Sequence, residues 1–191
     1  AALYEDENVS TFTADQFKAL AEDGSVHPDL ARSVMQAGIL QGGEKAFRIL
    51  CQRLEATDSE HERMNILMAL GSQKDPDLIR KTLSYTLENV PDRNRFIPLA
   101  AFSLNPHAIP LMWDWYLEHV QALETFHPLL YERVIAGIVP LAGMQSPEAV
   151  KDFFTDYMEK HPQTVDVVKL SLEKLEINLA MRKAAGSISI G

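Results

Sequence analysis

Cysteine, basic charge and long apolar runs are all scarce in this 191-residue sequence. A single cysteine, Cys51, leaves no internal disulfide and favours a reducing compartment. No stretch approaches the roughly 18 consecutive apolar residues of a membrane span, so no membrane partner is expected. Lys and Arg number 18 against 27 Asp and Glu, a formal net charge of −9. Nucleic acid, which is bound through clustered basic side chains, is therefore not an expected partner either.

The usual arrangements of catalytic residues are also missing. A zinc peptidase of the HExxH type needs two histidines four positions apart on one helix, with the glutamate as base. The one His-Glu pair, His61-Glu62, is followed by Asn65 where the second histidine would stand. Serines such as Ser72 and Ser146 have no histidine and acid nearby in the pattern of a nucleophile. The sequence therefore predicts no catalytic residue and no metal site in this chain.

The apolar pattern is helical along almost the whole chain. Val134, Ile138 and Leu141, for example, recur at spacings of three or four residues. This spacing, read together with the turn residues, predicts ten short helices, at residues 13–22, 28–39, 43–56, 59–70, 76–88, 92–103, 106–122, 128–141, 147–160 and 163–183.

Capping residues mark where these helices begin and end. Asp75 and Asn105 each stand directly before a proline and are predicted N-caps. Gly38 and Gly71 stand where the preceding helices are predicted to stop. The only strand-like alternation is a weak Ser-Ile-Ser-Ile run at 187–190, which we interpret as tail.

Short helices joined by short links indicate an all-α fold of stacked antiparallel helix pairs, an α-solenoid of the HEAT or armadillo type. No repeat signature is legible, so an irregular helical bundle is the alternative. No internal Gly-, Ser- or Pro-rich linker is present, which favours a single helical domain over 1–191. Within it, Cys51 and the aromatic residues Trp113, Trp115 and Tyr116 are expected in the core.

Three arginines are candidate substrate-binding residues. Arg93 and Arg95 flank Asn94 directly after Pro91, an arrangement that a solvated turn would also explain. Arg133 lies among apolar neighbours, so its guanidinium needs an anionic or polar partner. That partner is either an ion-pair partner inside the domain or a ligand in a cavity.

Several phrases occur in the order and spacing of one enzyme family. They are HPDLA (27–31), GGEKA (42–46), the stretch from Ala69 to Leu87 and the Asn-Pro stretch from Asn105 to Val120. Over residues 27–183 the chain resembles the C-terminal helical domain of aminopeptidase N-type zinc aminopeptidases, most closely the puromycin-sensitive and fungal cytosolic branch. Two positions depart from that family: Arg93-Asn94 replaces a Gln-Asp pair, and Ala108-Ile109 replaces a Gly-Arg pair.

The resemblance implies a noncatalytic fragment of a larger cytoplasmic enzyme. In such an enzyme the domain caps the active-site chamber and contacts the distal part of the peptide substrate. Zinc and the hydrolytic residues belong to the catalytic domain of the same chain, which is the second implied partner. Arg133 matches a basic position on the helix that faces the chamber.

A free-standing helical-repeat module that binds a protein partner is the alternative function. Only the first interpretation requires an HExxH motif and a GAMEN-type exopeptidase motif upstream in the same gene.

Overall fold

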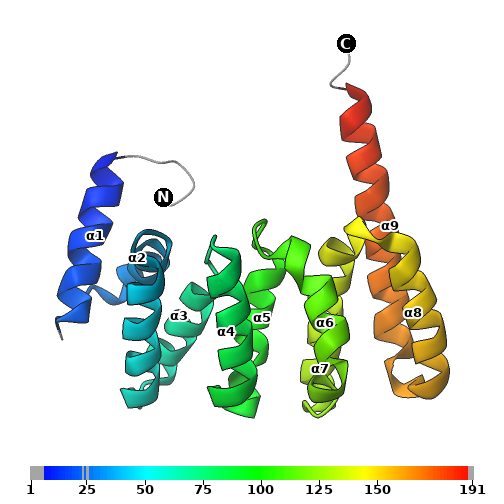
Figure 1. The fold of residues 1–191 in the computed structure, drawn as a ribbon, viewed down its shortest axis with the longest axis horizontal. Coiled ribbons are helices and arrows are strands. Elements are labelled where there is room, and N and C mark those ends of the chain that lie inside the picture. Colours follow the sequence, from blue (N-terminus) through cyan, green and yellow to red (C-terminus); the bar gives the residue numbers. More distant parts are fainter. Residues whose placement is uncertain (1–6, 23, 25, 189–191) are drawn as a thin grey trace. The chain divides into compact units, whose positions relative to one another are not determined.

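The computed structural model describes residues 7–22, 24 and 26–188, and all regular structure in them is helical (Figure 1). The all-α, solenoid-like architecture expected from the sequence is confirmed. The α-helices of the described residues are α1 (Glu7–Ala21), α2 (Pro28–Ala56), α3 (Glu60–Leu70), α4 (Pro76–Asn89), α5 (Phe96–Ser103), α6 (Ile109–Leu123), α7 (Pro128–Ala142), α8 (Pro147–Lys160) and α9 (Val165–Ile188). Single 3₁₀ turns, η1 (Asp92–Asn94), η2 (Gly143–Gln145) and η3 (Pro162–Thr164), precede α5, α8 and α9.

The chain divides into two compact units, residues 1–107 and 108–191. The first unit holds α1 to α5 and the second holds α6 to α9. Inside each unit, helices that follow one another in the sequence pack together, such as α2 on α3 and α6 on α7. Whether the two units behave as one domain, as the sequence predicts, stays a prediction.

Helix α2 contains two of the predicted helices, 28–39 and 43–56, joined by a kink. The backbone of Gly43 at this kink has φ 48° and ψ −129°, a conformation that side-chain-bearing residues rarely adopt. The kink therefore falls between the two predicted segments, and helical structure is present on both sides of it. Gly38 does not end a helix as predicted, because helical structure runs through it. Its missing side chain instead makes room for the ring of Phe17 on α1, since a Cβ at Gly38 would lie 2.1 Å from that ring.

The core of the first unit is centred on α2 and α3. Leu50 from α2 and Ile66 and Leu67 from α3 are fully buried against one another. Burial of one such side chain stabilises the fold by about 1.5–3 kcal/mol. Cys51 lies in the same cluster with 7% of its surface exposed, which confirms the predicted burial.

Asp75 caps α4 as predicted, but Asn105 does not cap α6. The Asp75 side chain accepts hydrogen bonds from the amides of Asp77 and Leu78 at 2.9 and 3.0 Å. Asn105 is buried and its amide nitrogen donates to the carbonyl oxygens of Gly71 and Gln73. Its Oδ1 accepts the backbone amide of His107 at 3.0 Å, so the side chain joins the link after α3 to the turn before α6, and α6 itself begins at Ile109.

The core of the second unit is aromatic and aliphatic. Trp113, Trp115 and Tyr116 on α6 are buried, as predicted. The rings of Phe154 on α8 and Tyr116 lie 6.1 Å apart between their centroids. Helix α9 packs along α7, and the side-chain amide of Asn178 donates to the carbonyl of Pro140 at 2.8 Å. The predicted tail at 187–190 belongs to α9 as far as residue 188, and its last two residues lie outside the described residues.

Candidate functional site

Arg133 lies on the outer side of α7. Its side chain is exposed, whereas Tyr131, Val134 and Ile135 around it are buried. The apolar neighbours that made Arg133 a candidate therefore belong to the opposite face of the helix. Its proposed contact with substrate stays a prediction.

Arg93 and Arg95 both lie in the link before α5, and each makes hydrogen bonds and an ion pair that stabilise this link. Arg93 donates to Glu60 at 3.4 Å, and its side chain is 71% exposed. Arg95 donates to the carbonyl of Val90 at 2.9 Å and pairs with Asp92 at 2.9 Å, with only 22% of its side chain exposed. Arg93 is thus the more accessible of the two, and Arg95 stabilises the turn.

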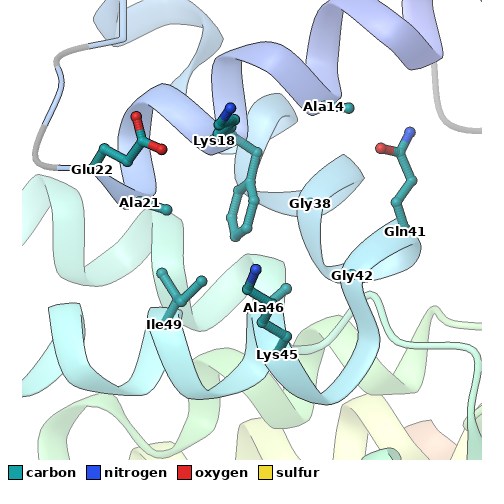
Figure 2. A pocket seen from close by; sticks show the side chains of 11 residues that line it. Ala14, Lys18, Ala21, Glu22, Gly38, Gln41, Gly42, Lys45, Ala46 and Ile49 are labelled. Atoms are coloured by element: carbon teal, nitrogen blue, oxygen red, sulfur yellow. The ribbon is translucent and has the colours of Figure 1, made fainter.

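Helices α1 and α2 enclose a groove of about 540 Å³ in the first unit (Figure 2). It is lined by Lys18 on α1, by Glu22 directly after α1, and by Lys45 and Ile49 on α2. Gln41 ties the two helices together by donating to the Ser10 hydroxyl at 2.9 Å. The walls are mostly apolar and the charges at the rim are of both signs, so the groove has no marked preference for ligand charge.

A chain of three tyrosines crosses the second unit and ends at a carboxylate. The hydroxyls of Tyr116 and Tyr131 are 2.8 Å apart, and those of Tyr131 and Tyr157 are 2.7 Å apart. Tyr157 donates to Oε1 of Glu124 at 2.8 Å. Because each phenol has one proton, this last bond sets the direction of the others: Tyr116 donates to Tyr131, and Tyr131 donates to Tyr157.

Burial raises the pKa of Tyr116, Tyr131 and Tyr157 above the usual value of a tyrosine. All three phenols therefore stay protonated at physiological pH, and Tyr157 remains a hydrogen-bond donor to Glu124. His161 stacks flat on Tyr157, with ring centroids 4.0 Å apart and an angle of 9° between the planes. Its Nε2 lies 3.6 Å from Oε1 of Glu124.

This chain of tyrosines opens into a cavity of about 290 Å³ where α6 ends, α7 begins and α8 ends. We call it the tyrosine cavity. It is lined by Glu124, Phe126, Pro128, Tyr131, Glu132, Tyr157, His161, Gln163 and Thr164. Two of the lining side chains are carboxylates, and no lysine or arginine lines it. Among the described residues, Glu132 has neither a hydrogen bond nor an ion pair, and Oε2 of Glu124 accepts none.

Sequence reasoning did not find the tyrosine cavity, although it selected a residue next to it. The sequence pattern indicates Arg133, whereas the preceding residues Tyr131 and Glu132 line the cavity. Glu124 and Tyr157 are 33 positions apart, and no short motif links them. The only signal was a tyrosine within each of three apolar stripes, where the hydroxyl would need a buried partner.

The residues that the structure describes do not fit a zinc site. In the described residues, no group of three or more His, Cys, Asp or Glu side chains could hold a metal ion. At the incomplete HExxH position, Asn65 is buried and its Oδ1 accepts a hydrogen bond from Arg32 at 3.1 Å, while His61 is exposed. A zinc ion would therefore find neither a second imidazole nor a free donor there.

The fold places the chain in the class of all-α, solenoid-like proteins. No helix in the described residues is long and apolar enough to cross a membrane. The family described as the ERAP1-like C-terminal domain matches residues 1–177, and the chain belongs to this family. It is a C-terminal domain of the aminopeptidase N type, as the sequence phrases had indicated.

Three similar proteins agree with this assignment at low identity. The chain is 24% identical over 157 residues to the probable aminopeptidase 2 of Sulfurisphaera tokodaii, covering 80% of this chain and 20% of that protein. It is 25% identical over 124 residues to the alanine/arginine aminopeptidase of Saccharomyces cerevisiae, covering 62% of this chain and 14% of that protein. The mitochondrial aminopeptidase 2 of the same yeast is 25% identical over 134 residues, with coverages of 68% and 14%. The chain thus spans a fifth or less of the length of these relatives.

Proposed function

We propose that this chain is the noncatalytic C-terminal domain that caps the active-site chamber of a zinc aminopeptidase and contacts the distal part of its peptide substrates. The family match over residues 1–177 carries the proposal. The three relatives that are named aminopeptidases support it. The chain covers only a small part of each relative, so the zinc ion and the hydrolytic residues belong to the remainder of the parent enzyme.

In this proposal Arg133, Arg93 and Arg95 are the basic residues that meet the peptide. The exposure of Arg133 and Arg93 supports the role, because both guanidinium groups are accessible from outside their own unit. Arg95 contributes mainly by fixing the turn that presents Arg93. We also propose that the parent enzyme is cytoplasmic, with which the single buried thiol of Cys51 is compatible.

The test compares long and short substrates of the full-length enzyme. A charge-assisted Arg–carboxylate contact contributes on the order of 1.5–3 kcal/mol. Arg133→Ala should therefore lower kcat/KM for peptides of several residues by roughly tenfold or more. It should leave hydrolysis of a single aminoacyl reporter unchanged, because the reporter does not reach the cap. Arg80→Ala, which removes an exposed arginine of α4, is the matched control and should change neither rate.

Two results would contradict the proposal. One is an Arg133→Ala enzyme that hydrolyses long peptides at the wild-type rate. The other is a gene in which no HExxH motif accompanies this domain, and that result would favour the free-standing interaction module. Arg93→Ala tests the second basic position in the same assay.

A further inference from the structure

We propose that the tyrosine cavity is a binding site for a guanidinium group, such as the side chain of an arginine in a peptide or protein segment. The cavity is separate from the three arginines discussed above, and the inference does not depend on the aminopeptidase assignment. It rests on the charge, the aromatic walls and the size of the cavity.

The charge of the cavity is negative and is not compensated from within. Glu132 is half-buried and has no hydrogen-bond or ion-pair partner in the described part of the chain. Glu124 uses Oε1 to accept the Tyr157 hydroxyl, which leaves Oε2 available. The neighbouring Arg133 does not line the cavity, and the one lining side chain that can become cationic is His161. A half-buried carboxylate without a partner is unfavourable in the empty cavity, so a cation that reaches it is bound favourably.

Helix ends of both polarities lie around the cavity. Glu124 directly follows the last residue of α6, and His161 directly follows the last residue of α8. The carbonyl groups at both helix ends carry partial negative charge toward the cavity region. Two N-terminal helix ends oppose them, that of α7 at Pro128 and that of α9 at Val165, directly after the lining residue Thr164. The contributions of the helix ends therefore oppose one another, and the negative charge of the cavity comes from its two carboxylates, Glu124 and Glu132.

The walls select a flat cation over a compact one. Tyr157 and His161 present stacked parallel rings, and Tyr131 and Phe126 complete an aromatic lining. Guanidinium is planar, is weakly hydrated, stacks on aromatic faces and donates to carboxylates in pairs. A volume of about 290 Å³ is slightly below the roughly 300–1,000 Å³ of pockets for drug-sized ligands, and it therefore suits one side chain.

The orientation of the tyrosine chain also favours a cation. Every phenol proton in it points toward Glu124, and the raised pKa values of the three tyrosines keep those protons in place. The chain thereby fixes the Glu124 side chain in position, so the carboxylate does not need to reorganise when a ligand arrives.

In the experiment the 191-residue chain is titrated with N-acetyl-arginine amide at pH 8 and low salt. Binding is monitored through the chemical shifts of the backbone amides. N-acetyl-citrulline amide serves as the neutral ligand of the same shape. The arginine derivative should shift residues in 124–132 and 157–164 and bind at least about tenfold more tightly than the citrulline derivative, as expected for loss of a charge-assisted contact. Binding should weaken with added salt.

Glu132→Gln is the decisive variant because it removes the charge and keeps the shape. It should weaken binding of the arginine derivative by roughly tenfold and leave the citrulline derivative unaffected. Glu173→Gln, on the exposed side of α9 and outside the cavity, is the matched control and should bind as the wild type does. Equal binding of the two ligands, shifts confined to residues elsewhere, or a Glu132→Gln chain that binds arginine normally would each overturn the proposal. Circular dichroism and thermal melting verify that the variants are folded.

Discussion

Replacing Gly71 by alanine tests how closely α3 and α5 approach one another in the first unit. A Cβ at Gly71 would lie 2.3 Å from the Cβ of Ala101 on α5, with the carbonyl oxygen of Pro98 at 3.2 Å and the amide nitrogen of Phe102 at 3.3 Å. None of these atoms belongs to a flexible side chain, so α5 itself must move. Overpacking of this kind typically costs about 1–3 kcal/mol.

An opposing effect reduces this cost. Gly71 has φ −76° and ψ 0°, which alanine can adopt, so the substitution also removes freedom from the unfolded chain. That effect stabilises the fold by about 0.4–1 kcal/mol. We therefore expect a net destabilisation of about 1–2 kcal/mol, or a fall in Tm of roughly 2–8 °C for a chain of this length.

A double-mutant cycle separates the clash from other consequences of Gly71→Ala. Ala101→Gly alone should cost about 1 kcal/mol because glycine weakens α5. In the double variant the Cβ of residue 101 is absent, so the clash is removed. The destabilisation of the double variant should therefore be smaller than the sum of the two single-variant destabilisations by at least about 0.5 kcal/mol. Urea denaturation of the four chains measures this coupling. Strict additivity, or a Gly71→Ala chain as stable as the wild type, would show that the helices are not in the close contact described.

Two further predictions concern ionisable groups in the first unit. Burial in the core raises the pKa of the Cys51 thiol to about 12, so thiol reagents at pH 7–8 should label the native chain far more slowly than the denatured chain; similar rates would contradict the burial. Burial alone would raise the pKa of Glu62, but the hydrogen bonds from Thr57 and Arg53 outweigh it and hold that pKa below the usual value. The folded state therefore releases this proton more readily than the unfolded state, and the resulting stability is present at neutral pH and is lost as the pH falls through the lowered pKa. Glu62→Gln should reduce the unfolding free energy by about 1 kcal/mol at pH 7 and by less near pH 3, measured by urea denaturation at both pH values; an equal effect at both would refute the assignment.

The helices could be predicted from the sequence because each is specified by residues close together in the chain. Apolar spacing and a cap such as Asp75 act within a few positions, and the structure confirms both. The same reasoning gave wrong predictions for Gly38 and Asn105, because the residue type at each position is determined by a partner that is distant in the sequence. Gly38 accommodates Phe17, and Asn105 binds the carbonyls of Gly71 and Gln73. A local pattern cannot distinguish a helix end from a contact site when the same residue types serve both.

The tyrosine cavity was missed for a related physical reason. Along the middle of each helix the backbone groups bond within the helix, so most side chains that face a neighbour there are apolar, with exceptions such as Thr82 and Tyr116. At the ends, backbone groups are left without helical partners, and polar side chains gather to satisfy them. Asn105 does this at the end of α3, and Glu124 and His161 follow the ends of α6 and α8. In a fold of short helices, polar groups from segments distant in the sequence therefore meet at the links between helices. The residues of these links can differ between proteins, and with them the ligands that are bound, without disturbing the apolar core between the helices.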